Sequence, residues 1–194
     1  MMIDAKKYSV SETLKNGLQV TIRSIRPDDS KALLAAFKEL EDRTVYLRFF
    51  GAKQKVSPQE LTEATDVDFV RTVALVTCMQ SVAGEKIIGA GRYIAFGDAD
   101  PPDMAEVAFA VEEDYQGLGI AGKMLRHLAV IAKQKGIVQF HAEVMTENKG
   151  MLAVFNRSRF PVEQEFEEGL VHVTLLLAGG GKPQKFTTEE TEKI

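Results

Sequence analysis

The hydrophobic and polar positions near the N-terminus predict a strand that follows an irregular segment. Residues 1–16 are polar, and we expect them to be ill-defined. From residue 17 onward Leu18, Val20 and Ile22 alternate with polar side chains, which is the period of a half-buried strand. The ordered part of the chain is therefore expected to begin at residue 17.

Three helices are expected next, over residues 26–40, 41–51 and 57–65. Leu33, Phe37 and Leu40 give the first helix an apolar stripe, because they recur at helical spacing. Ser57 and Pro58 form a good cap and first-turn pair for the third helix. These helices separate the first strand from the next group of strands.

The middle of the chain predicts three antiparallel strands. Residues 69–79 and 86–96 are rich in β-forming side chains, and the short link between them contains glycine and polar residues, as in a hairpin. Residues 104–111 form the third strand. A glycine turn and a long helix follow, and the helix has one apolar side made of Ile120, Met124, Leu128 and Ile131.

A further strand, a helix and a pair of strands are expected over residues 136–145, 147–159 and 162–177. The strand pair turns at Glu168 and Gly169. This order predicts a mixed α/β sheet, antiparallel in its first half, within a single domain over residues 17–178. Residues 179–194 are Gly-rich and then charged, and we expect a flexible C-terminal tail.

Composition excludes several classes of protein. Of 194 residues, 45% are apolar and 27% are charged, as in an ordinary globular domain, and the net charge is −4. The basic residues are scattered, so we expect no nucleic-acid partner. No apolar run is long enough for a membrane span or a signal peptide, so we expect no membrane partner and a cytoplasmic location.

Cysteine and histidine usage gives no metal site. Cys78 is the single cysteine and lies in an apolar run, which favours a packed thiol over a reactive one. The three histidines have no metal-ligand spacing with one another or with Cys78. Glu112, Glu113 and Asp114 are consecutive acids in a turn, which is typical of a solvated surface. We therefore expect no metal.

The stretch from Gln116 to Lys123 combines three phosphate-binding patterns. It contains G-x-G-x-x-G, all but the last letter of the P-loop pattern, and Q-x-x-G-x-A, a loop that holds the pyrophosphate of coenzyme A. Glycines at the start of a helix let backbone N–H groups approach an anion closely, and the helix N-terminus favours negative charge. A tight strand-to-helix turn without any ligand would also explain the glycines.

The surrounding sequence separates these patterns. The P-loop fails because Met124 stands where a Ser or Thr hydroxyl should hold magnesium. A dinucleotide fold has a carboxylate about twenty residues beyond its loop, and Glu143 is at that distance. However, Glu143 lies inside a strand, "EEDYQ" separates the preceding strand from the glycines, and the chain starts and ends with hairpins rather than further βαβ units.

The coenzyme A pattern fits its whole context. "AEVAFAVEEDYQGLGIAGKMLRHLAVIAKQKGI" resembles the cofactor-binding core of the GNAT superfamily of N-acetyltransferases, and "FHAEVMTENKGMLAVFNRSRF" resembles the next strand and helix of those enzymes. "YLRFFG" together with "AEV" resembles a narrower group, the Pat-type protein lysine acetyltransferases of bacteria. The resemblance covers residues 17–178. It implies a GNAT fold with a central splayed parallel pair of strands and flanking helices.

The resemblance also implies how acetyl-CoA would be held as cosubstrate. The backbone of Phe109 and Val111 would bond the acetyl and pantetheine groups, and N–H groups near Val111 would stabilise charge on the carbonyl oxygen. The pyrophosphate would be wrapped by backbone N–H groups of the turn, which belong to Gln116, Gly117, Leu118, Gly119, Ile120, Ala121 and Gly122. Lys123 would either add charge to a phosphate or be a solvated first-turn lysine.

The chemistry of amine acetylation requires a base. A lysine amine, with an ordinary pKa of about 10.4, is protonated at neutral pH, and only the neutral amine attacks a thioester. Glu106 is a lone carboxylate among apolar residues in "MAEVAFA", where burial would raise its pKa. The "AEV" pattern of the Pat-type group implies that Glu106 is this catalytic base. A strand glutamate that points to solvent is the alternative.

Two residues of the helix expected over residues 147–159 leave questions open. Many GNAT enzymes have a tyrosine that protonates the departing thiolate, and this chain has Phe155 there, so water would replace the tyrosine or activity would be lost. Asn148 would contact the cofactor's amide backbone, or it would simply cap a helix.

The sequence therefore predicts an acetyl-CoA-dependent N-acetyltransferase whose acceptor is an amine, and the Pat-type resemblance implies that this amine is a protein lysine. A GNAT acting on a small amine and a non-catalytic acyl-CoA-binding sensor module are the alternatives. Neither the acceptor nor the oligomeric state can be read from these residues.

Overall fold

A computed structural model of the protein describes residues 3–49, 55–82 and 84–177. Within these residues one mixed sheet has eight strands in the order β1-β2-β3-β4-β5-β6-β8-β7. The strands are β1 (Ser9–Thr13), β2 (Gln19–Ser24), β3 (Thr72–Ser81), β4 (Gly84–Phe96), β5 (Met104–Val111), β6 (Gln139–Met145), β7 (Val162–Glu167) and β8 (Leu170–Leu176). The helices are α1 (Ser30–Glu39), α2 (Asp42–Phe49), α3 (Pro58–Thr65), α4 (Ile120–Gln134) and α5 (Lys149–Asn156), with short 3-10 turns η1 (Ala5–Lys7), η2 (Pro27–Asp29) and η3 (Glu113–Tyr115).

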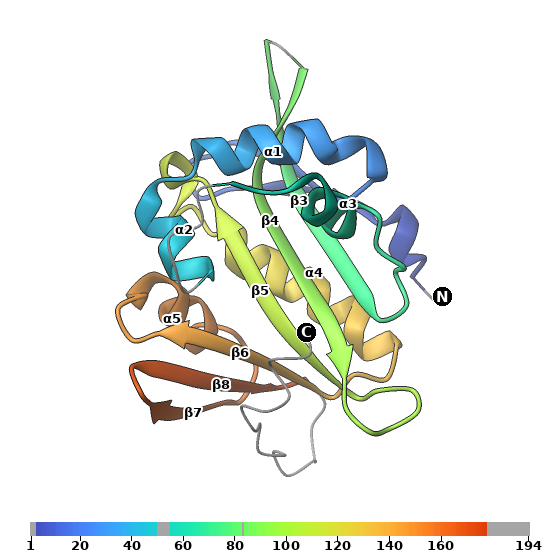
Figure 1. Ribbon diagram of the computed structural model, residues 1–194, viewed down its shortest axis with the longest axis vertical. Helices are drawn as coiled ribbons and strands as arrows, with labels where there is room; N and C mark the ends of the chain where they lie inside the picture. The colour runs from blue at the N-terminus through green and yellow to red at the C-terminus, as the bar shows by residue number, and fades with distance from the viewer. Residues whose placement is uncertain (1–2, 50–54, 83, 178–194) are drawn as a thin grey trace.

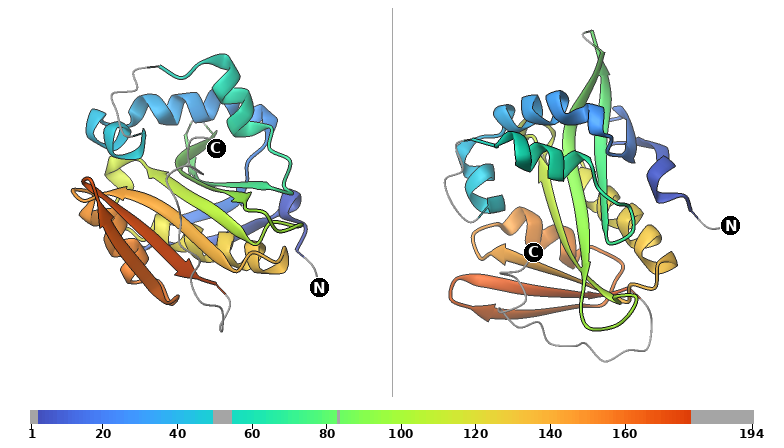
Figure 2. Two further views of the ribbon diagram at one scale, coloured as in Figure 1. Left: turned by 60° about the horizontal axis from the view of Figure 1, so that its bottom comes forward. Right: turned by 45° about the vertical axis from the view of Figure 1, so that its right-hand side comes forward.

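The expected fold class is confirmed. β3 and β4 form the hairpin, β5 pairs antiparallel with β4, and β6 joins β5 in parallel. Helices cover both faces of the sheet: α1 and α3 lie on one face, and α4 and α5 lie on the other (Figures 1 and 2). The expected tail lies outside the described residues, as does the predicted end of the second helix at Gly51.

The two helix signals read from the sequence have clear structural counterparts. Ser57 caps α3, because its hydroxyl accepts the Glu60 N–H while the Glu60 carboxylate accepts the Ser57 N–H. The apolar side of α4 is buried against the sheet through Ile120, Met124, Leu128 and Ile131. This packing fixes the start of α4, and therefore the glycine turn before it, relative to β4 and β5.

One expectation for the N-terminus is wrong. Residues 1–16 were expected to be ill-defined, but β1 pairs antiparallel with β2 over five residues. β1 is an edge strand whose side chains are exposed or only half-buried, so it lacks the apolar alternation that marks a strand with one buried face. Pairing with β2 orders β1, and the buried side chains of Ala5 and Leu14 anchor the segment before and after it.

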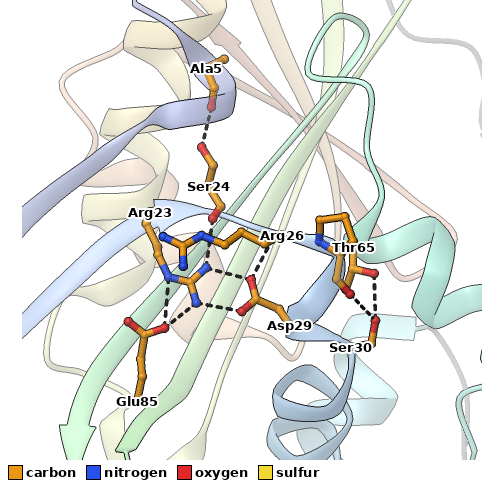
Figure 3. A network of polar contacts seen from close by, with 9 residues as sticks. Ala5, Arg23, Ser24, Arg26, Asp29, Ser30, Thr65 and Glu85 are labelled. Carbon is orange, nitrogen blue, oxygen red and sulfur yellow. Dashed lines mark hydrogen bonds and ion pairs between the residues drawn. The ribbon is translucent and has the colours of Figure 1, made fainter.

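A buried ion pair holds the start of α1 against the sheet (Figure 3). Arg23 on β2 donates to both carboxylate oxygens of Asp29 at 2.8 Å, and Asp29 also accepts the Arg26 N–H at 2.8 Å. Both ionic side chains are buried, and Glu85 of the β3–β4 hairpin is a second partner of Arg23. Although burial alone raises the pKa of Asp29, these hydrogen bonds bring it below its ordinary value.

Replacing Arg23 with methionine is expected to lower the free energy of unfolding by about 3–5 kcal/mol, because a buried carboxylate then loses its bidentate partner. Urea unfolding at neutral pH measures the change. The double variant Arg23→Met with Asp29→Leu should recover most of the loss. The free energy of unfolding that the double variant recovers should not depend on pH in the acidic range. In the wild type, the contribution of the ion pair is lost as pH falls through the lowered Asp29 pKa. A cost below about 1 kcal/mol for the single variant would contradict the assignment.

Candidate active site

The two central parallel strands separate soon after they begin. β5 and β6 pair only at Met104–Gln139, Ala105–Phe140 and Glu106–His141, and then diverge toward their C-terminal ends (Figure 1). A cavity of about 510 Å³ occupies this region, with walls from β5, β6, α2, α5 and the glycine turn before α4. The central splayed pair expected for the fold is therefore present.

The backbone of β5 faces this cavity at alternate residues. Glu112 donates its N–H to Ile88 on β4 at 3.1 Å, so even-numbered residues near the end of β5 direct their backbone groups toward β4. Phe109 and Val111 consequently direct theirs into the gap where β6 has moved away. The side chains of both residues are buried, so a ligand there would meet their main-chain groups. The Val111 carbonyl among these groups already accepts one hydrogen bond, from the Gln116 side chain.

The glycine turn presents unbonded helix donors to the same cavity. Gly117 and Gly119 have positive φ of 73° and 94°, values that favour glycine. Gly119 is the N-cap of α4 and offers no side-chain cap, and the first backbone bond of the helix runs from Lys123 to Gly119 at 3.0 Å. The N–H groups of Ile120, Ala121 and Gly122 therefore have no acceptor within the helix. This arrangement fits an anionic group such as a pyrophosphate.

Two residues of the predicted loop contribute differently from the others. Gln116 donates its backbone N–H to Glu113 at 3.0 Å, so that group is already used within the turn. Its side-chain amide donates to the Val111 carbonyl at 3.0 Å and to Thr44 at 3.2 Å. Gln116 thus ties the end of β5 to α2. Leu118 lies in the turn and its carbonyl accepts a hydrogen bond from Lys15, but it does not line the cavity.

Glu106 lies at the point where the strands part. Phe109 packs against Phe155 of α5, with ring centroids 6.4 Å apart, so odd-numbered side chains of β5 face the α4–α5 side. Glu106 therefore points to the opposite side, toward α2, and is half-buried in the cavity wall. Burial raises its pKa, while the positive charges of Arg48 and Arg92 oppose that rise. The expected raised pKa agrees with this environment, and the alternative of a solvent-directed strand glutamate does not.

Asn148, the N-cap of α5, and Phe155 within that helix both lie in the cavity wall. The Asn148 side chain accepts the Met151 N–H at 3.1 Å, so its capping role is present; a contact with the cofactor stays a prediction. Phe155 is buried and brings no hydroxyl to the site. Any proton for a departing thiolate must therefore come from another source.

Sequence reasoning missed two cations of the cavity wall, Lys15 and Arg48. Lys15 belongs to the turn between β1 and β2, and Arg48 belongs to α2, where burial lowers its pKa to about 10. Lys15 lies in no motif, and Arg48 lies in the "YLRFFG" stretch, whose resemblance gave this arginine no role. Contacts across the fold bring both to the site. Lys123, in contrast, pairs with Glu12 at 2.6 Å and is not a solvated lysine.

A family comparison assigns the class. Residues 36–160 match the sequence profile of the acetyltransferase (GNAT) family. Together with the splayed strands and the glycine turn, this match places the chain in the GNAT family of acetyltransferases. The protein is accordingly an N-acetyltransferase whose cosubstrate is acetyl-CoA.

Its relatives include the Pat-type group. An acetyltransferase of Pseudomonas aeruginosa is 29% identical over 140 residues, 72% of this chain and 74% of that protein. Acetyltransferase Pat of Mycolicibacterium smegmatis is 31% identical over 144 residues, and the match spans 74% of this chain but 42% of Pat. The solved GNAT domain of S. lividans PAT has a TM-score of 0.78 at 32% identity, covering 86% of this chain and 95% of that domain.

Two features are absent from the described residues. No cluster of His, Cys, Asp and Glu among them could hold a metal ion. None of their helices is both long enough and apolar enough to cross a membrane.

Gly122→Ala tests whether the helix start must admit an anion. A methyl group at Gly122 would meet no protein atom within 4 Å, and alanine favours helix, so the free energy of unfolding should stay constant or rise by up to about 1 kcal/mol. If the N–H groups there approach phosphate oxygens, coenzyme A affinity should fall roughly tenfold, as for one weakened charge-assisted hydrogen bond.

Isothermal titration calorimetry with coenzyme A, beside thermal unfolding of the same samples, measures both quantities. Gly122→Val should weaken binding further. Unchanged affinity in both variants would show that this face of the turn does not touch the cofactor.

Proposed function

We propose that this enzyme transfers the acetyl group of acetyl-CoA to the side-chain amine of a protein lysine, with Glu106 as the base. The observation that carries the proposal is the position of Glu106, a half-buried carboxylate with a raised pKa in the wall of the cavity between the splayed strands. The similarity to Pat of M. smegmatis and to the S. lividans PAT domain supports the assignment.

The residues of the site divide the work of the reaction. The N–H groups of Ile120, Ala121 and Gly122 would hold the pyrophosphate, and the main chain of Phe109 and Val111 would align the pantetheine arm along the exposed edge of β5. Acetyl-CoA supplies the acetyl group as a thioester. The acceptor nitrogen forms the new bond to the acetyl carbon, the carbon–sulfur bond breaks, and the proton lost by the amine passes to Glu106 directly or through water.

Charged neighbours of Glu106 favour a neutral acceptor. Arg48 and Arg92 are the cations that act on Glu106 most strongly. Cations near an ammonium group disfavour its charged form, so a lysine that reaches this point would lose its proton more easily. The same cations limit the rise in the Glu106 pKa, so they keep part of the carboxylate ionised and able to accept that proton.

The sheet face beside Glu106 supports a cationic protein acceptor. Gln164 on β7 contacts Asn156 of α5, so its odd-numbered neighbours Glu163, Glu165 and Glu167 point to the face away from α5, and all three are exposed. Glu143 on β6 lies on that same face and also lines the cavity. A lysine-bearing surface would meet an acidic approach there.

Phe155 is consistent with water as the acid for the departing thiolate. Its ring lines the cavity without a polar atom, and the thiol of coenzyme A is a far better leaving group than an alkoxide and needs little assistance. The departure from the tyrosine of many GNAT enzymes therefore changes the source of a proton and not the reaction.

Free-thiol release from acetyl-CoA distinguishes the candidate acceptors. Lysine-bearing proteins and peptides should support turnover, and mass spectrometry should locate the acetyl group on lysine Nζ. Turnover with polyamines or other small amines only would assign a small-molecule acceptor. Tight coenzyme A binding without thiol release for any amine would favour the sensor alternative and contradict the proposal.

Glu106→Gln is expected to lower kcat by at least roughly 100-fold, which is the usual contribution of a general base. The amide has the same shape but cannot accept the proton. Coenzyme A affinity, measured by calorimetry, should stay within about twofold because the substitution leaves the helix donors intact. A small loss of kcat would remove Glu106 from the chemistry.

Arg48→Met tests the electrostatic coupling through the pH dependence of kcat/KM. Loss of this cation should raise the Glu106 pKa further, because its positive charge opposes the rise caused by burial. Since the base must be ionised, the acidic limb of the profile should move to higher pH by the same amount. Arg48→Lys keeps the charge and serves as the control. A shift toward lower pH in Arg48→Met would contradict the coupling.

A further inference from the structure

The turn between β1 and β2 packs directly on the glycine turn that precedes α4. Lys15 donates its backbone N–H to the Leu118 carbonyl at 3.2 Å and its Nζ to the Gly117 carbonyl at 3.1 Å, although 102 residues separate Lys15 from Gly117. A methyl group at Gly119 would lie 3.7 Å from the Lys15 Cε. The first hairpin therefore forms one side of the cofactor loop.

Neighbouring cations of this region are already neutralised. Glu12 on β1 accepts hydrogen bonds from Lys123 at 2.6 Å and His127 at 2.9 Å, and it also pairs with Arg126. Although burial alone raises the pKa of Glu12, these partners lower it to about 2, so it is ionised at all physiological pH values. Lys123 and Arg126 consequently have a permanent carboxylate partner and do not line the cavity.

Lys15 differs from these residues in both respects. It lines the cavity, and within the described part of the chain its ammonium group has a neutral carbonyl as its partner and no carboxylate. The remaining hydrogen-bond donors of this exposed ammonium group face water. Replacing that water with an anionic oxygen would strengthen the interaction, because charge-assisted hydrogen bonds are about twice as strong as neutral ones. A chain of net charge −4 offers little general attraction for a polyanionic cosubstrate, so a local cation matters.

We propose that Lys15 binds the phosphates of coenzyme A, and that the β1–β2 turn is thereby the second wall of the cofactor site. The phosphates that this cation could meet are the pyrophosphate, beside the donors of α4, and the 3′-phosphate of the ribose. Both are anionic phosphate oxygens, and the experiment distinguishes them. The proposal rests on the glycine turn being the cofactor site and does not depend on the acceptor.

The test is calorimetric titration of coenzyme A into wild-type protein and Lys15 variants. Lys15→Met should weaken binding about tenfold at low salt, and the difference should shrink as salt screens the charge. Lys15→Arg should bind within about threefold of wild type, because it keeps the charge. Lys7→Met, which removes an exposed lysine that does not line the cavity, is the matched control and should leave affinity unchanged.

Dephospho-coenzyme A separates the two phosphates. If Lys15 meets the pyrophosphate, the loss in Lys15→Met persists with this ligand. If Lys15 meets the 3′-phosphate, dephospho-coenzyme A binds to wild type and to Lys15→Met with equal affinity. Wild type then also binds dephospho-coenzyme A more weakly than it binds coenzyme A. Either result supports the proposal.

Lys15→Gln tests a purely structural role. Glutamine can still donate to the Gly117 carbonyl but carries no charge, so it should behave like Lys15→Met if the charge is what matters. Wild-type affinity in Lys15→Gln, or an affinity within twofold of wild type in Lys15→Met, would overturn the proposal. Lys15 is exposed, so all variants should fold, and thermal unfolding checks this. A failure here would leave acetyl transfer to lysine intact, since that is measured separately by thiol release.

Discussion

The separation of β5 from β6 is the constraint on which the rest of the site depends. Backbone N–H and C=O groups at a sheet edge need hydrogen-bond partners. Beyond Glu106, the groups of β5 that face β6 no longer pair with that strand. The gap stays open because each strand is held by its other neighbour: β5 pairs with β4 through Val111, and β6 pairs with β8 through Met145. An extended ligand with amide groups is what such an edge can accept.

Packing on the α4 side keeps this geometry rigid. A methyl group on Gly91 would lie 2.6 Å from the Phe109 ring, so glycine is required on β4 for that ring to fit. Phe109 then contacts Phe155 of α5 and positions the Asn148-capped helix beside the gap. The same layer buries Met124 and fixes the first turn of α4. The glycine turn and the β5 edge are thus two parts of one rigid unit.

The N-terminal hairpin and α2 complete the wall of the cavity. Glu12 binds the first turns of α4 through Lys123 and Arg126, and Lys15 follows it in the turn that touches Gly117. The positive charge of Arg48 on α2 acts on Glu106 and opposes the rise in its pKa. The proposed base and the proposed phosphate contact therefore both depend on elements far away in the sequence.

Local patterns determined a large part of this protein. The apolar side of α4, the Ser57 cap, the β3–β4 hairpin and the glycine turn follow from short-range periodicity, capping and backbone freedom, so they were predictable, as was the position of Glu106 within a strand. The polar strand β1 was not, because its order comes from long-range contacts, namely its pairing with β2 and the bonds of Glu12 to α4. Lys15 lies in no motif, and the "YLRFFG" stretch that contains Arg48 did not mark it as a site residue. Only the tertiary structure brings the two cations to the cavity, since long-range contacts decide which charges face one another.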